Sequence, residues 1–199
     1  MKKLITVGAA LLATITLAAC GSTTSSSSGP SSAASSKSAS KLITRTAYSS
    51  IKLGDMGNNG DGGDTLKDLT AKYGKPESST TATTNGIKVD GREWNNVEGG
   101  SDAKLIVSFV NEKAVGKNIT AMKTDRKNDI TLDAYNKITT GTSYDDVNKQ
   151  LGEPNSINES VFSGTTTLIA VYMNKDMTQF ATITFTNNAV SSKTETNLK

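Results

Sequence analysis

Apolar side chains recur at helical spacing in two short segments of the chain. In the first segment, Leu66, Leu69 and Tyr73 fall at positions i, i+3 and i+7, which places them on one face of an α-helix. Thr65 and Asp68 stand at its start in a capping-box arrangement, which is typical of a helix N-terminus. The second segment repeats this design with residues of similar kinds at the same spacing: Ser143, Tyr144, Asp146, Val147 and Leu151.

Both helical segments finish on the same signal. Gly74 and Gly152 follow the last apolar positions, and Pro76 and Pro154 stand two residues further on. Glycine at this place adopts the left-handed conformation that closes a helix, and proline prevents the helix from continuing. We therefore predict that the two helices end at these glycines.

Downstream of each helical segment, apolar and polar residues alternate. The first alternating run contains Leu105, Val107 and Phe109, and the second contains equivalent positions: Ala181, Ile183 and Phe185. A period of two is typical of half-buried β-strands. Breaks rich in glycine and asparagine favour hairpin turns between the strands: Asn85-Gly86, Gly99-Gly100 and Asn187-Asn188.

The segments belong to two similar halves of the chain. The pattern Y-x-x-I-x-x-G begins at Tyr48 and again at Tyr135, and Trp94 in the first half corresponds to Tyr172 in the second. Such a recurrence indicates tandem repeats. We predict an α+β fold of two tandem repeats, residues 41–123 and 124–199, each a helix-loop-helix packed on a four-stranded antiparallel sheet. Because each half is too small to bury much apolar surface alone, we expect the halves to pack side by side.

The first residues have the polarity pattern of an export signal. Lys2 and Lys3 precede an apolar run over residues 4–17, which is shorter than the roughly 20 residues that a membrane-spanning helix needs. We predict a signal peptide over residues 1–19. The sequence Leu17-Ala18-Ala19-Cys20-Gly21 resembles the lipobox of bacterial lipoproteins. This resemblance implies acylation of Cys20, with palmitate or a similar chain, and a place on the extracytoplasmic face of the cell membrane.

Composition supports an anchored, exported protein. Residues 20–40 combine the lipidated cysteine with a serine-rich stretch that lacks large apolar side chains, and we predict a flexible tether there. Cys20 is the only cysteine, so the chain forms no internal disulfide. The formal net charge of +3 is accounted for by three lysines before residue 41, so the remaining chain has no basic excess with which to bind nucleic acid: Lys2, Lys3 and Lys37.

The residue inventory excludes several classes of enzyme. The chain has no histidine and no thiol besides Cys20, which rules out Ser-His and Cys-His nucleophilic chemistry and a zinc site. No serine or carboxylate lies in a recognisable catalytic signature. We predict a protein that is not an enzyme and that has no cofactor.

One segment, residues 54–64, is rich in glycine and in oxygen-bearing side chains. Calcium prefers hard oxygen ligands, and four are present here: Asp55, Asn59, Asp61 and Asp64. An EF-hand loop would need a glutamate twelve positions along, counting Asp55 as the first, and Leu66 stands there. The segment is therefore either a calcium site or an insertion whose glycine, asparagine and aspartate residues form turns.

These patterns together resemble those of Gram-positive lipoproteins with a tandem β-lactamase-inhibitor-protein-like domain. The resemblance covers residues 41–199 and rests on the lipobox, the serine-rich tether and the two units of Y-x-x-I-x-x-G, [ST]-x-x-[DE], G-x-P and an aromatic residue. It implies that the two sheets together form a concave, protein-binding face. It also implies that the hairpins over residues 95–102 and 173–178 contact the partner, the first through an acid, which is supplied by Glu98 or Asp102.

In the inhibitors the second hairpin presents an aromatic side chain, whereas here it offers Met177. Trp94 and Tyr172 are either core residues at equivalent positions or anchors for a partner. Our leading hypothesis is a membrane-anchored, extracytoplasmic, non-enzymatic module that binds another protein of the cell envelope. The alternative is an envelope lipoprotein that senses calcium or a small molecule through the segment 54–64.

Overall fold

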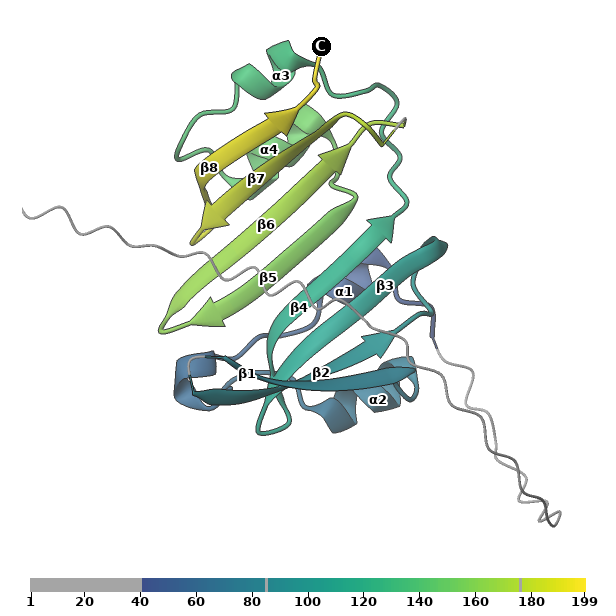
Figure 1. Cartoon of the computed structure of the whole chain (residues 1–199), viewed down its shortest axis with the longest axis vertical. Helices are drawn as coiled ribbons and strands as arrows, with labels where there is room; N and C mark the ends of the chain where they lie inside the picture. The colour runs from purple at the N-terminus through teal and green to yellow at the C-terminus, as the bar shows by residue number, and fades with distance from the viewer. Residues whose placement is uncertain (1–40, 85, 176) are drawn as a thin grey trace, which may run out of the picture. The chain divides into compact units, whose positions relative to one another are not determined.

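The folded part of the chain contains one antiparallel sheet of eight strands, in the spatial order β1-β2-β3-β4-β5-β6-β7-β8 (Figure 1). The structure is a computed structural model that describes residues 41–84, 86–175 and 177–199. The strands are β1 (Ser78–Thr84), β2 (Ile87–Trp94), β3 (Gly99–Val110), β4 (Lys113–Met122), β5 (Ser156–Phe162), β6 (Thr165–Met173), β7 (Phe180–Thr186) and β8 (Ala189–Thr196). The short helices are α1 (Arg45–Ser49), η1 (Met56–Asn58), α2 (Leu66–Tyr73), α3 (Leu132–Asn136) and α4 (Tyr144–Leu151).

The predicted architecture of two repeats, each with its own four-stranded sheet under a helix-loop-helix, is wrong. β4 pairs directly with β5, with Lys117 opposite Glu159 and Ile119 opposite Ile157, so a single sheet runs through the whole fold. The helices are also too short to form substantial layers of their own, since α1 and α3 have five residues each. The physical reason is that a strand edge exposes unpaired backbone groups, and joining β4 to β5 pairs two such edges.

The predicted helix ends are confirmed. The side chain of Thr65 accepts a hydrogen bond from the backbone N–H of Asp68 at the start of α2, and Ser143 does the same for Asp146 at the start of α4. Both helices end at a glycine with positive φ, 87° at Gly74 and 78° at Gly152.

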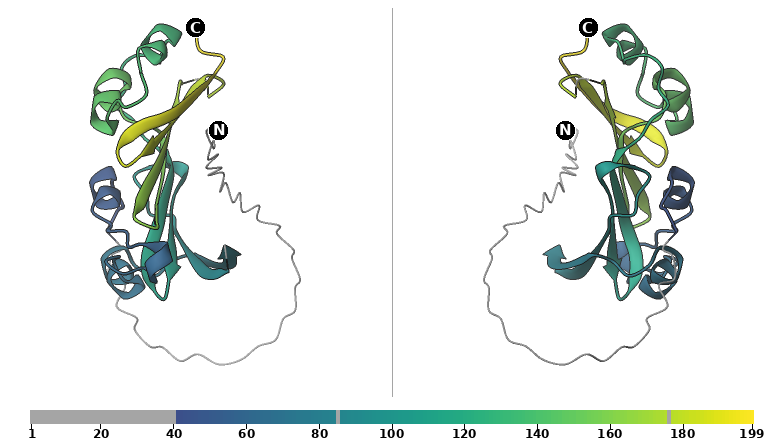
Figure 2. Two further views of the ribbon diagram at one scale, coloured as in Figure 1. Left: turned by 90° about the vertical axis from the view of Figure 1, so that its left-hand side faces the viewer. Right: turned by 90° about the vertical axis from the view of Figure 1, so that its right-hand side faces the viewer.

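All the helices lie on one face of the sheet, and the core is the layer between them and the strands (Figure 2). The helices contribute inward-facing residues such as Leu69 and Val147, both fully buried. The strands contribute alternate residues from their covered face: Leu105, Val107, Phe109, Ile119, Ile157, Ala170, Tyr172, Ala181, Ile183 and Phe185. The buried residues fall into an N-terminal and a C-terminal cluster, and the partly buried Tyr144 and Leu168 pack against both.

Two charged side chains connect the N-terminal half of the fold to the start of the C-terminal half. Arg45 on α1 pairs with Glu153 at 2.7 Å and donates a hydrogen bond to the carbonyl oxygen of Pro154 at 2.8 Å. Lys117 on β4 pairs with Glu159 on β5 at 3.2 Å and donates to the Ile51 carbonyl oxygen at 3.0 Å. These contacts fix the junction at which the two halves share one sheet.

Candidate functional site

One whole face of the sheet has no described helix or strand over it (Figure 2). Because side chains alternate along a strand, the neighbours of the buried residues point to this face. One row of paired positions crosses it from β3 to β8: Ile106, Asn118, Asn158, Ile169, Thr184 and Ser192. Asparagine, threonine and serine occupy four of these positions and isoleucine the other two, a mixture that suits both a hydrated surface and a protein contact.

The open face is bounded at one side by β1 and β2, which project away from the helices (Figure 2). The antiparallel order places the β2–β3 and β6–β7 connections at the same end of the strands, so both border this face. These are the two segments that were predicted to contact a partner.

The β2–β3 connection is held by hydrogen bonds to the backbone before α1 and at the end of α2. The amide of Asn96 donates hydrogen bonds to the carbonyl oxygens of Lys41 at 2.9 Å and Tyr73 at 3.1 Å, and the N–H of Glu98 donates to the Ile43 oxygen at 2.9 Å. A Cβ atom on Gly99 would lie 2.6 Å from that of Ala103, so the chain needs glycine there. The side chains of Glu98 and, further along, Asp102 are exposed. Glu98 in the connection and Asp102 near the start of β3 therefore present two carboxylates close to a restrained backbone.

Trp94 and Tyr172 lie in the core, with 1% and 0% of their surface exposed. The indole N–H of Trp94 donates to the Gly74 carbonyl oxygen at 2.8 Å, and the hydroxyl of Tyr172 donates to Oδ1 of Asn148 at 2.8 Å. Burial raises the pKa of Tyr172 above its ordinary value. These two aromatic residues therefore tie the strands that lead into the connections to α2 and α4, and neither is exposed to a partner.

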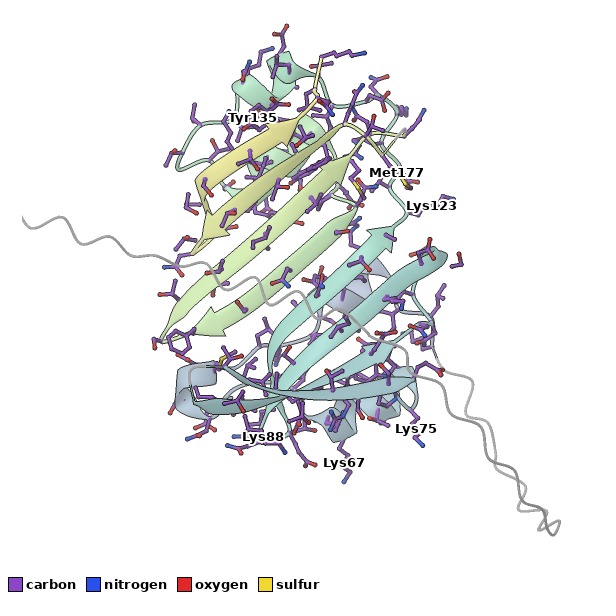
Figure 3. The ribbon with its side chains drawn as sticks, viewed as in Figure 1. Lys67, Lys75, Lys88, Lys123, Tyr135 and Met177 are labelled. Atoms are coloured by element: carbon purple, nitrogen blue, oxygen red, sulfur yellow. The ribbon has the colours of Figure 1, made fainter. Side chains whose placement is uncertain are left out.

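The β6–β7 connection is organised by Asn174, a polar side chain with only 4% of its surface exposed. Its Oδ1 accepts from the N–H of Ile130 at 2.7 Å, and its Nδ2 donates to the Ile130 oxygen at 3.1 Å and to Oε1 of Gln179 at 3.0 Å. Met177 stands on this base with a φ of 57° and 73% of its surface exposed (Figure 3). A methionine so exposed on a firmly based turn is an adaptable apolar contact.

A shallow hollow lies beside this connection, between β6 and residues 124–129. The guanidinium of Arg126 lines it and donates to Oδ1 of Asn155 at 2.8 Å, to the Met173 oxygen and to the Glu153 oxygen at 3.3 Å. Burial lowers the pKa of Arg126, while the charge of Asp129 opposes that shift. Since its donors already serve protein acceptors, we assign Arg126 to holding the connection in place.

The four candidate calcium ligands of segment 54–64 each have a protein partner. The carboxylate of Asp55 accepts from the N–H groups of Gly57 at 2.7 Å, Ser163 at 2.8 Å and Gly164 at 2.6 Å. Desolvation raises its pKa, but these donors outweigh that effect and hold the pKa below its usual range. The remaining side chains contact separate groups: Asn59 with Asn111, Asp61 with Lys113, and Asp64 with the N–H of Lys52.

The structure therefore does not bring the three carboxylates of this segment together. Among the described residues, no group of three or more histidine, cysteine, aspartate or glutamate side chains is arranged to hold a metal ion. The segment instead links α1 to the β5–β6 turn through Asp55.

Other predictions concern residues that the structure does not describe. Cys20, the signal peptide and the whole predicted tether lie outside the described residues. Within the described part, no helix is long and apolar enough to cross a membrane.

Sequence reasoning did not identify Asn96, Arg126 or Asn174 as organising residues. Each acts on a backbone group far along the chain, and Asn174 and Ile130 are 44 positions apart. For Asn96 and Asn174 the local signal was an asparagine near the end of a predicted strand, which also fits an ordinary turn, and Arg126 had no such signal.

Comparison with known proteins identifies both a family and a fold. The family described as "Domain of Unknown Function with solved-structure structure" (DUF3862) matches residues 40–198. A solved structure from Streptococcus mutans, described as that of a proposed beta-lactamase inhibitor protein, matches with a TM-score of 0.64 and 22% identity over 78% of this chain and 96% of that chain. This likeness confirms the predicted inhibitor-like fold. No curated protein matches the sequence.

Proposed function

Since the chain belongs to the DUF3862 family, whose function is unknown, we propose its function from its own surfaces: a membrane-anchored, extracytoplasmic module that binds another protein of the cell envelope without catalysing a reaction. The observation that carries this proposal is the uncovered sheet face, bordered by the two connections with Glu98 and Met177 and by Asp102 near the start of β3. A broad face of mixed polarity with an apolar point and two acids at its border suits a folded protein partner.

The hydrogen bonds of Asn96 and Asn174 at the base of the two connections support binding. Association costs free energy for every loop that must be ordered, so a loop already fixed in the free protein loses less on binding. Asn96 and Asn174 supply this order here through buried or half-buried hydrogen bonds to the backbone. The exposed side chains of Glu98 and Met177 then contact a partner from a backbone that is already ordered.

The anchor in this proposal is Cys20. Acylation there, followed by the serine-rich segment, would hold residues 41–199 close to the outer surface of the cell membrane of a Gram-positive cell. Two or more acyl chains give stable anchoring, since each buried CH₂ contributes about 0.8 kcal/mol.

The residue inventory supports a non-enzymatic role, because the chain has no histidine and only one cysteine. The name of the Streptococcus mutans protein suggests an enzyme as the partner in that case. In this chain the exposed residue of the second connection is methionine, so we propose an envelope protein as the partner and leave its class to experiment.

Affinity capture tests this proposal. The full chain, tagged after Lys199 and purified from membranes in detergent, should capture a protein from solubilised envelopes of its own cell. A variant with Glu98→Lys and Asp102→Lys should lose it, because both charges at the border of the face are reversed. A matched control with Asp133→Lys and Asp145→Lys, two exposed acids on the helical side, should keep it. Equal capture by both variants, or no capture by the wild type, would overturn the proposal.

A further inference from the structure

Two lysines on the covered face of the sheet make similar contacts with a tyrosine of a short helix. Lys117 on β4 donates to the carbonyl oxygens of Tyr48 at 3.3 Å and Ile51 at 3.0 Å, and its Nζ lies 4.6 Å from the centre of the Tyr48 ring. Lys193 on β8 donates to the oxygen of Tyr135 at 2.7 Å and lies 4.2 Å from the centre of that ring. Each lysine thus caps the end of a short helix that packs on its strand.

The strands that carry these lysines are also covered in the same way at their first residues. On β4, Ala114 exchanges backbone hydrogen bonds with Gly54 and Asp64. On β8, Val190 does so with Gly141 and Thr142. In both strands this cover stops just before the lysine.

Beyond that point the two strands differ. β4 pairs with β5, and Glu159 on β5 stands opposite Lys117 and forms an ion pair with it. β8 is the last strand of the sheet, and among the described residues no strand pairs with the outer edge of positions 192–195 (Figure 1). Lys193 therefore has the helix contacts of Lys117 without an acid across the edge.

The outer edge of β8 also carries an acidic residue near Lys193. Glu195, whose Oε2 accepts a hydrogen bond from the N–H of Leu198 at 3.0 Å, is two positions from Lys193 and so lies on the same face of the strand. If a second copy of β8 pairs antiparallel with the first about Thr194, Lys193 of each copy stands opposite Glu195 of the other. This arrangement reproduces the Lys117–Glu159 pairing twice.

We propose that two copies of this chain associate through β8, antiparallel and centred on Thr194, so that the eight-stranded sheet continues across a two-fold axis. A two-fold interface needs a surface that complements itself, and the Lys193 and Glu195 pair supplies it. The opposite edge of the sheet, β1, has no charged residue among its seven and offers no matching acid. The open faces of the two copies then form one continuous surface.

Disulfide trapping tests the register. Residues centred on the axis lie about 4.5 Å apart between Cα atoms in a non-hydrogen-bonded antiparallel pair, which is within the span of a disulfide. Full-length chain with Thr194→Cys should therefore form a disulfide-linked dimer on a non-reducing gel. Thr83→Cys, an exposed position on the β1 edge, is the matched control and should not. The wild-type chain controls for links through Cys20.

Charge reversal tests the pairing. In the Thr194→Cys background, Glu195→Lys should abolish the cross-link by placing two lysines opposite each other in both pairs. Adding Lys193→Glu should restore it, because the charges are then opposite again. A Thr194→Cys chain that cross-links no more than Thr83→Cys, or cross-linking that survives Glu195→Lys, would overturn the proposal. If Lys193→Glu prevents folding, as a circular dichroism spectrum would show, the Glu195→Lys result decides alone.

Discussion

The ammonium group of Lys117 on β4 lies 3.2 Å from the carboxylate of Glu159 on β5, across the strand pair at which the two halves of the sheet join. The lysine side chain is 5% exposed and the glutamate side chain 24%. The same lysine also caps the end of α1, so it connects three elements of the fold.

Replacing Lys117 with alanine should therefore destabilise the protein strongly. The change leaves Glu159 without its partner and removes the lysine donor from the carbonyl oxygens of Tyr48 and Ile51. Breaking a buried pair costs about 3 to 5 kcal/mol, less where one partner is partly exposed, so we expect about 2 to 3 kcal/mol. Urea unfolding followed by circular dichroism measures this. Lys149→Ala, which removes an exposed pair with Asp146, is the control and should leave the midpoint unchanged. Equal midpoints for both variants would show that the junction does not depend on Lys117.

Truncation of the inward helical residues should also destabilise the fold. Leu69 and Val147 are fully buried at the same position of α2 and α4. Leu69→Ala should cost about 2 to 5 kcal/mol, and Val147→Ala should cost less because fewer methyl groups are lost. Met177→Ala is the comparison, since that side chain is largely exposed and its truncation should change stability by under about 0.5 kcal/mol. Denaturant midpoints measure all three, and unaltered midpoints for Leu69→Ala and Val147→Ala would contradict the described core.

Stability should fall at alkaline pH. Burial, with the charge of Glu159, raises the pKa of the Tyr48 hydroxyl far above its ordinary value near 10. The unfolded chain releases this proton as the pH rises through about 10, whereas the folded chain keeps it, so the stabilisation present below pH 10 is lost above it. Unfolding free energies measured from neutral to alkaline pH should show this decline. The decline should be shallower in Tyr48→Phe, and an identical slope would rule out Tyr48 as its source.

Lipidation should depend on Cys20 alone. Cells that express the wild-type chain should incorporate labelled palmitate into it, whereas Cys20→Ser should incorporate none, since no other cysteine is present. Ser22→Ala, two positions along in the tether, is the control and should be labelled like the wild type. Labelled Cys20→Ser protein would contradict the proposed anchor.

The sequence predicted local features well because they depend on neighbouring residues. The caps at Thr65 and Ser143 and the glycine ends of α2 and α4 each rest on contacts within a few positions. The alternation in β3 and β7 likewise reflects which side chains face the core. Separate four-stranded sheets were wrongly expected, because the pairing of β4 with β5 joins residues about 40 positions apart, and no local pattern encodes it.

For the candidate site, too, local sequence patterns did not show which residues the fold buries. The resemblance to the inhibitors pointed to Glu98 or Asp102 as the acid of the first hairpin; both are exposed, and their contact with a partner stays a prediction. The sequence left two interpretations of Trp94 and Tyr172, core residues or anchors for a partner, and the structure places both in the core. Their equivalent positions in the chain agreed with either interpretation, since packing and binding both favour aromatic residues.

The central claim is that the open sheet face binds the envelope partner. Asn158 is an exposed residue of β5 in the row that crosses this face, and Asn136 is an exposed residue at the end of α3 on the opposite side. Surface plasmon resonance with the captured partner should compare Asn158→Arg with Asn136→Arg, which add the same side chain to the two sides. We predict that Asn158→Arg raises Kd by about tenfold or more, equivalent to about 1.4 kcal/mol, while Asn136→Arg leaves it unchanged. An unchanged Kd for Asn158→Arg, or an equal loss in both variants, would contradict binding through this face.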